Sequence, residues 1–342
     1  MKTRLIFLFA LTLILAACEN QKNEFDDFGS TGVYFPFQTP ARSLILGKYD
    51  LGFNDNDNNK RFEITVTMGG VYTNDIERKV SFVKAPELLD DVDNVVALPD
   101  NYYNIVTESP VTIPVGSTKG RITIQLTDAF FQDPLSFARV RDSVNYVVPL
   151  LITDVENLDF ILAGEAAVDN PSRVNETHWS IFPKDFTLFG IKYINKYHAY
   201  YLRRGVDVVT DAAGQSIDNV YSNEFIERDE LVLATISGEN NIELLNRVRR
   251  GNNTSPGDVN LELSFDDNNN CIIGSYDSDP YNVTGTGKFV TDGDTWGGKP
   301  RDVIYLDYTY IDVLNNETHA VKDTLVVRDR NVVFEEFSIR LK

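Results

Sequence analysis

From Thr31 onward, apolar and polar residues alternate along the chain in short runs with a period of two. Two clear examples are RFEITVTM, residues 61–68, and RITIQLT, residues 121–127. Such alternation is typical of half-buried β-strands, because successive side chains of a strand point to opposite faces of the sheet. Since runs of this kind recur to the end of the chain, the sequence predicts an all-β protein.

Residues 31–158 carry several such runs, separated by turn-forming segments. This spacing favours an immunoglobulin-like antiparallel β-sandwich. The segment GSTKG, residues 116–120, is bounded by glycines and predicts a hairpin between the strands on either side. Pro149 lies inside the strand NYVVPLLIT and lacks a backbone N–H, so it is expected at an edge strand or a bulge.

Residues 159–180 lose the alternation and gather Gly, Ala, Asn and Pro, so they are predicted to link two domains. Residues 181–342 then show longer strands joined by polar turns, which indicates a β-meander. A meander can close into a lipocalin-like up-and-down barrel or curl into a second sandwich, and the sequence leaves both open. The segment NNIELLNRVRR, residues 240–250, is predicted to be a helix.

The first residues have the layout of a signal peptide. Lys2 and Arg4 precede an apolar run over residues 5–15, which is too short to span a bilayer, and Cys18 follows two alanines. Leu15-Ala16-Ala17-Cys18 resembles the bacterial lipobox. The resemblance implies cleavage after residue 17 and acylation of Cys18, which would anchor the protein to outer-membrane lipid.

Residues 18–30 are acidic and rich in amide side chains, so they are predicted to form a flexible tether. Acidic residues directly after the cysteine also resemble the export signal that sends Bacteroidota lipoproteins to the outer cell surface. We therefore expect the protein to face the cell exterior.

Composition excludes several classes of function. With 51 acidic against 32 basic residues, the net charge is −19, which disfavours nucleic acid as a partner. If Cys18 is acylated, Cys271 has no partner for a disulfide. The three histidines lack the spacing of a zinc motif and the acidic runs do not fit the calcium loop, so neither a metal nor another cofactor is expected.

No nucleophile elbow of the form G-x-S-x-G and no Gly-rich phosphate loop occurs, so the chain is predicted not to be an enzyme. The best candidate for ligand binding is the stretch from residue 291 to 310. Trp296 stands beside glycines there and can present its face to a sugar ring, or else fold back over the core as a plug. The other candidate residues are Asp292, Asp294, Lys299 and Arg301, which would bind sugar hydroxyls, and Trp179 as an alternative aromatic platform.

Several features together resemble one family. They are the lipobox, the acidic tether, the segments VTIPVGSTKGRITIQLTD and YVVPLLITDV, and the β-rich second half. The chain resembles the two-domain lipoproteins of Bacteroidota polysaccharide-utilisation loci, whose N-terminal domain also precedes some family 18 glycoside hydrolases. The resemblance implies a surface protein that binds a polysaccharide or oligosaccharide without cleaving it, beside a starch-utilisation-type transporter.

The hydrolase branch of that group is not favoured by the sequence. Its D-x-x-D-x-D-x-E motif is missing, and residues 181–342 are too few for a (β/α)₈ barrel, which needs about 250 residues. Two alternatives to glycan binding stay open: a structural or assembly partner of a transporter or enzyme complex, and, less favoured, a glycoside hydrolase of another fold.

Overall fold

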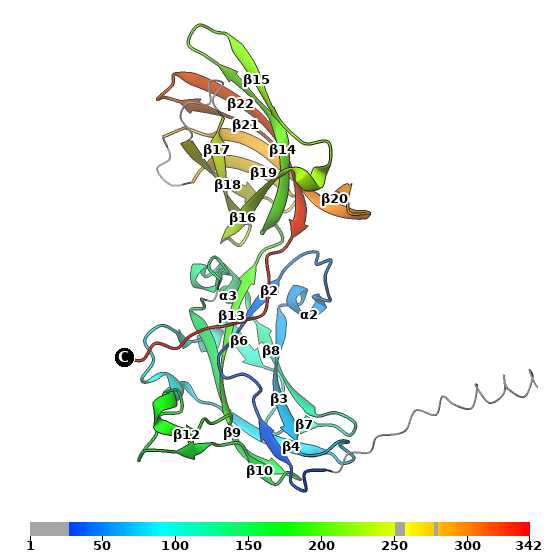
Figure 1. Cartoon of the computed structure of the whole chain (residues 1–342), viewed down its shortest axis with the longest axis vertical. Coiled ribbons are helices and arrows are strands. Elements are labelled where there is room, and N and C mark those ends of the chain that lie inside the picture. Colours follow the sequence, from blue (N-terminus) through cyan, green and yellow to red (C-terminus); the bar gives the residue numbers. More distant parts are fainter. Residues whose placement is uncertain (1–26, 142, 250–256, 277–279) are drawn as a thin grey trace, which may run out of the picture.

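The computed structural model describes residues 27–141, 143–249, 257–276 and 280–342. Two β-domains are stacked end to end, with a sandwich at the bottom of Figure 1 and a barrel at the top. The all-β prediction is confirmed. The predicted signal peptide, Cys18 and most of the tether lie outside the described residues. Within the described part of the chain, no helix has the length and apolar character needed to cross a membrane.

The first domain consists of two main sheets that pack face to face. One sheet has the order β10 (Phe160–Ile161), β1 (Gly32–Tyr34), β3 (Arg61–Gly69), β8 (Lys119–Leu126), β6 (Tyr103–Ile105). The other has the order β23 (Glu335–Glu336), β2 (Pro40–Ile45), β13 (Phe186–Ile194), β9 (Tyr146–Glu156), β4 (Arg78–Lys84), β7 (Val111–Ile113), with β5 (Val96–Ala97) also on β9. A two-stranded ribbon accompanies them, formed by β11 (Glu165–Ala166) and β12 (Trp179–Ile181).

The helices are short and lie in the connections. They are α2 (Asp55–Asn58), α3 (Asp128–Gln132) and the 3₁₀ turns η1 (Pro86–Leu89), η2 (Asp100–Tyr102), η3 (Pro134–Ser136), η4 (Glu176–His178) and η5 (Ile226–Arg228).

The sandwich core follows directly from the alternating pattern. In β3 and β8 every second residue is buried, and these side chains meet those of β4 and β9 from the opposite sheet. Most strand pairs are antiparallel as predicted, but β2 runs parallel to β13, β1 to β10, and β5 to β9. These parallel pairs arise because strands far apart in the sequence return to the same sheet.

Two local predictions in the sandwich are wrong. The segment 116–120 does not close a hairpin, since β7 pairs with β4 in one sheet while β8 pairs with β3 and β6 in the other. Pro149 lies in β9, an interior strand between β13 and β4, rather than at an edge. The missing N–H is tolerated because the carbonyl of Ala85, just beyond the end of β4, instead accepts a hydrogen bond from Leu88 N at 3.1 Å.

The second domain is a closed eight-stranded antiparallel barrel, which settles the choice between a barrel and a second sandwich. Seven strands follow in chain order and β14 closes the ring by pairing with β22 along its length, while β15 extends the outer half of β14. The strands are β14 (Ala199–Thr210), β15 (Ser216–Tyr221), β16 (Glu230–Gly238), β17 (Asn241–Val248), β18 (Gly257–Phe265), β19 (Asn270–Ser275), β20 (Thr284–Trp296), β21 (Lys299–Asp312) and β22 (Glu317–Asp329). The helix predicted over residues 240–250 is wrong, because this segment forms β17.

The predicted domain boundary is also displaced. Residues 159–180 and 181–342 were expected to be the linker and the second domain, but β13 is an inner strand of the sandwich. The last residues return to the sandwich as well: β23 pairs with β2, and the chain end bonds to the segment around Asp91. Figure 1 shows this C-terminal segment, in red, running from the barrel down along the first domain.

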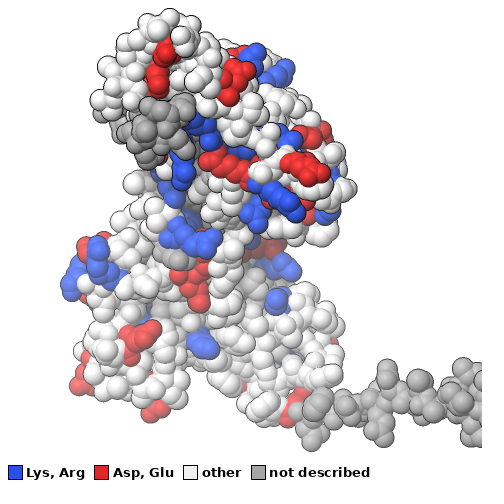
Figure 2. All heavy atoms as spheres, turned by 45° about the horizontal axis from the view of Figure 1, so that its top comes forward, with Lys and Arg blue, Asp and Glu red and all other residues white. Residues whose placement is uncertain are grey.

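The junction between the domains is polar at its rim and tightly bonded at its centre. In the view of Figure 2, basic and acidic side chains alternate along the waist of the molecule. Arg139 of the sandwich binds Glu243 of the barrel at 2.6 Å. The buried guanidinium of Arg330 donates to four carbonyl oxygens, those of Leu46, Lys48, Asn195 and His198, at 2.6–3.0 Å. Burial lowers the pKa of Arg330 to about 10.

A buried histidine at the junction is expected to make the protein less stable at acid pH. His198 is buried, and its Nδ1 accepts a hydrogen bond from Ile236 N at 3.1 Å, which requires a neutral ring. Burial, assisted by the charge of Arg330, lowers the pKa of His198 to about 3. As the pH falls, His198 is therefore protonated in the unfolded chain before it is protonated in the folded protein. The free energy of unfolding decreases as the pH falls from about 6.5 toward 3, by up to about 1.4 kcal/mol per pH unit.

His198→Asn keeps a hydrogen-bond acceptor at this position and does not titrate. Urea unfolding at pH 7, 6, 5 and 4 is expected to give a shallower loss of unfolding free energy for this variant than for the wild type. Parallel pH profiles for the two proteins would contradict the prediction.

Candidate functional site

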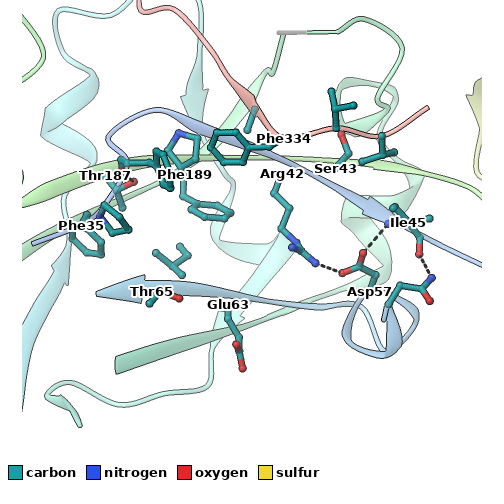
Figure 3. Close-up of a pocket in the computed structure, with 18 of the residues that line it drawn as sticks. Phe35, Arg42, Ser43, Ile45, Asp57, Glu63, Thr65, Thr187, Phe189 and Phe334 are labelled. Atoms are coloured by element: carbon teal, nitrogen blue, oxygen red, sulfur yellow. Dashed lines mark hydrogen bonds and ion pairs between the residues drawn. The ribbon is translucent and has the colours of Figure 1, made fainter. Parts of the chain in front are cut away.

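A groove of about 680 Å³ opens in the sandwich between β2 and β3. It is lined by the strands β2, β3 and β13, by the segment after β1, by the connection that contains α2, and by the tail that follows the barrel. Figure 3 shows aromatic side chains gathered at one end of the groove and an ion pair at the other.

The groove exists because the two sheets do not close along this side. β1 pairs with β3 only over residues 67–69, and within the described part of the chain no strand covers residues 61–66 of β3 on that edge. The opposite wall is β2, which β23 covers only at its first two residues. A strip between the sheets therefore stays accessible.

Exposed aromatic rings line the mouth of the groove. Phe37 and Phe334 face each other with ring centroids 4.9 Å apart, and they are 43% and 64% exposed. Phe53 lies on the connecting loop and is fully exposed. The floor is also aromatic, with Phe35 buried and Phe189 stacked on Phe62 at 5.5 Å. Exposed rings grouped at a concave site are typical of surfaces that bind a ligand.

At the other end of the groove, the side chain of Arg42 is oriented by an ion pair with Asp57. Asp57 in α2 is buried; one of its oxygens accepts from Arg42 Nη2 at 2.6 Å and the other from Ile45 N at 2.9 Å. Asn54 fixes the same loop by donating to the carbonyls of Ile45 and Gly47. The side chain of Arg42 remains 43% exposed. Since a guanidinium carries five N–H donors, it can bind ligand oxygens while it keeps its contact with Asp57.

The wall formed by β3 differs in character, because Glu63 of β3 points away from the aromatic rings in Figure 3. Its carboxylate pairs with Arg121 on β8 at 2.5 Å. Glu63 therefore lines the groove with its charge engaged by Arg121, and the ion pair of Arg42 and Asp57 lies at the end of the groove away from the rings.

The sequence-predicted stretch lies in a second, smaller pocket of about 260 Å³ at the domain junction. Trp296 is half-buried there, and its indole N–H donates to Val327 O at 2.9 Å. The guanidinium of Arg301 lies 4.5 Å from the centre of the ring and covers one of its faces. Lys299 lines the same pocket, and Tyr49 lines both this pocket and the groove, so the two sites are neighbours.

The charged residues of that stretch are engaged in holding the domains together. Asp292 binds Lys48 at 2.5 Å, and Arg301 binds Asp50 at 2.9 Å. Burial on its own lowers the pKa of Lys48, but the bond to Asp292 and the charges of Asp50 and Asp302 outweigh burial and raise it. Burial also raises the pKa of Asp302, whose carboxylate accepts from Asp292 N at 3.0 Å.

The remaining candidates lie apart from this pocket or bond locally. Asp294 accepts from Thr295 N at 2.6 Å. Trp179 lies in β12 of the sandwich, half-buried, with its indole N–H donating to Ser172 O at 2.8 Å. Since β12 lies in the sandwich and β20 in the barrel, the structure does not bring the two tryptophans together.

The residues of the groove were not predicted from the sequence. Three separated segments, residues 35–37, 49–57 and 332–334, meet only because the tail returns to the sandwich. One local signal was available: the motif F-x-F at Phe35 and Phe37 places two rings next to a strand end, with prolines beside them.

Comparison with known proteins supports the two-domain organisation. Residues 25–159 match a family described as "-like, N-terminal domain", and residues 196–331 match the family described as Domain of unknown function (DUF5627). The second match begins where the barrel begins. No curated protein matches the chain.

Two solved structures are similar to the chain. A crystal structure of a Bacteroides ovatus protein of unknown function is 35% identical, covers 93% of this chain and 99% of its own, and superposes with a TM-score of 0.82. A Bacteroides thetaiotaomicron protein described as an auxiliary nutrient binding protein is 14% identical over 88% of this chain and 95% of its own, with a TM-score of 0.37. At that score the second likeness carries no argument about fold or function. None of these matches bears on the predicted link to family 18 glycoside hydrolases.

Proposed function

Because this chain belongs to the two-domain family that the Bacteroides ovatus protein represents, we propose that it is a surface lipoprotein that binds glycans without cleaving them. The binding site is the groove of the sandwich, and the chain acts as an accessory to polysaccharide uptake. Cys18 carries the lipid anchor in this proposal.

The observation that carries the proposal is the pairing of exposed rings with a fixed arginine in one groove. Sugar rings have apolar C–H faces that pack on aromatic side chains, here Phe37, Phe53 and Phe334. Sugar hydroxyls need donors and acceptors of fixed orientation, and Arg42 is oriented by Asp57. A groove of about 680 Å³ is of the size that holds a few sugar units.

The position of the tether suits such a role. The described chain enters the sandwich at the end remote from the barrel, where Asp27 accepts from Tyr72 N at 2.6 Å. The groove lies toward the other end of the sandwich, beside the domain junction. An anchor at Cys18 would therefore hold the groove away from the membrane, where long polymers can reach it.

A second candidate function is docking of a protein partner. The uncovered edge of β3, residues 61–66, borders the groove, and an extended peptide can add to such an edge as a strand. This would fit an assembly role beside a transporter or an enzyme. The glycan proposal is preferred because the exposed rings and Arg42 together suit a polar ligand with apolar faces.

The first test is a screen of the chain from residue 19 to 342 by affinity electrophoresis against plant, fungal and host polysaccharides. Reducing-end assays on the same samples report any cleavage. We expect one polysaccharide class to retard the protein without release of product. Product release would favour a hydrolase, and no retardation by any polysaccharide would shift the proposal to docking of a protein.

A further inference from the structure

Three potential metal ligands meet at the end of the barrel that is remote from the sandwich. Asp312 ends β21, and Glu317 and His319 lie at the start of β22, across the hairpin. One ligand atom from each of them lies within 4.8 Å of the other two. Neighbouring ligands at metal bonds of about 2.0–2.2 Å are roughly 3.5 Å apart, so small side-chain movements would close such a site.

The Nε2 atom of His319 is aimed into this cluster, and among the described residues it has no hydrogen-bond partner. The side chain is completely buried. Its nearest acidic neighbour is Glu317 Oε2 at 3.8 Å, beyond hydrogen-bond distance, and that oxygen is likewise without a partner. Unsatisfied buried polar atoms are costly, and two such atoms that face each other across this gap are suited to coordinate one cation between them.

The other ring nitrogen is fixed in the way that metal-binding histidines require. His319 Nδ1 lies 2.8 Å from Asp207 Oδ2, and Tyr310 stacks on the ring with a centroid distance of 4.2 Å. A carboxylate that accepts from Nδ1 leaves the lone pair on Nε2, which then points toward Glu317 and Asp312. Asp207 thus holds the ring as a positioning residue.

Charge favours a cation in the same place. Asp207, Asp312 and Glu317 supply three carboxylates around one imidazole, and all but Glu317 are fully buried. Asp312 accepts bonds from Leu314 N at 3.1 Å and from Asn315 Nδ2 at 2.8 Å, which order the hairpin. Glu317 keeps 14% exposure of its side chain, which gives an ion a route from solvent.

We propose that Asp312, Glu317 and His319 bind one divalent transition-metal cation, with Zn²⁺ the favoured ion for one imidazole and two carboxylates. The ion would link the β21–β22 hairpin to β14, because His319 is hydrogen-bonded to Asp207 of β14. The site could not be predicted from the sequence because its ligands, spaced as D-x₄-E-x-H, do not have the Cys/His spacing of the common zinc motifs. The hairpin register, which pairs Asp312 with Glu317, brings them together.

The test is titration of the chelator-treated chain, residues 19–342, with ZnCl₂ by isothermal calorimetry. We expect one Zn²⁺ per chain with micromolar or tighter affinity, and a rise in the melting temperature of the wild type on zinc addition. Glu317→Gln, at the rim of the site, should weaken zinc binding at least tenfold and abolish the thermal shift. Asp207→Asn should weaken binding about tenfold to a hundredfold, because it removes the carboxylate behind the histidine.

Matched controls separate this site from other ligands. His178→Gln changes a histidine of the sandwich, and Glu336→Gln changes an exposed carboxylate; both should bind zinc as the wild type does. Circular dichroism confirms that each variant is folded before titration. A folded wild type that binds no zinc would overturn the proposal, as would equal zinc affinity in the wild type and in Glu317→Gln.

Discussion

Asp323→Ala is expected to lower the unfolding free energy by about 3–5 kcal/mol, because it removes the only carboxylate that is hydrogen-bonded to the buried guanidinium of Arg203 among the described residues and leaves Glu230 at 3.9 Å as its nearest counter-ion. Arg203 Nη2 donates to Asp323 Oδ2 at 2.7 Å, and both side chains are almost fully buried inside the barrel. Tyr221 and Tyr308 donate to the same carboxylate, and Asn246 links Arg203 to Tyr308. Burial raises the pKa of Tyr308 well above its usual value, so this hydroxyl stays a donor.

The matched control lies next to it in the same strand. Lys322 pairs with Asp307 on the outer face at 3.4 Å, with both side chains largely exposed. Lys322→Ala should change stability by about 0.5 kcal/mol or less. Replacing the whole buried pair by Arg203→Met and Asp323→Leu should cost less than Asp323→Ala alone. Urea unfolding measures all three, and an Asp323→Ala protein as stable as the Lys322→Ala control would contradict the account.

Arg330→Ala is expected to separate the unfolding of the two domains. The four carbonyl oxygens that Arg330 binds belong to the loop after β2 and to the connection between β13 and β14. Removal of the guanidinium leaves buried carbonyls without a donor, at a cost of about 3 kcal/mol or more. We expect one cooperative calorimetric transition in the wild type and two in the variant.

Arg328→Ala is the control for this experiment, since Arg328 is two residues away and its side chain is 47% exposed. It should melt as the wild type does. A single, unshifted transition in Arg330→Ala would show that the junction does not depend on this residue.

The sequence predicted the strands whose inner face is entirely apolar. The alternation in residues 61–68 corresponds to β3, where every second side chain enters the core. The prediction from the sequence failed at β17. There Asn246 faces the barrel interior, where it is hydrogen-bonded to Arg203 and Tyr308, while Leu245 on the outer face is 62% exposed. A polar residue inside and an apolar one outside turned a strand pattern into an apparent helix pattern.

Pairing between distant segments could not be read from the sequence. Nearly all of β13 is buried, so its composition marks an inner strand but not the sheet to which it belongs. Its neighbours are β9, which precedes it, and β2, near the start of the chain. The groove depends on the same kind of contact, because Phe37 and Phe334 come from opposite ends of the chain.

Trp296 is a candidate ligand-binding residue whose surroundings could not be predicted from the sequence. The glycines beside it do leave the ring half-exposed, but Arg301 covers one face and the neighbouring charges bind the sandwich loop. Its pocket adjoins the groove through Tyr49, so a long glycan in the groove can extend toward it.

The central claim is that the groove binds a glycan, and the association constant of a groove variant tests it most directly. Phe37→Ala combined with Phe334→Ala removes the paired rings at the mouth, and Phe225→Ala removes a ring of similar exposure on the barrel. Each groove ring that packs on a sugar over roughly 60–100 Å² contributes about 1.5–2.5 kcal/mol. Affinity electrophoresis on the polysaccharide that retards the wild type should therefore show at least tenfold weaker binding for the double variant, and wild-type binding for Phe225→Ala. Equal retardation of the double variant and the wild type would contradict the account.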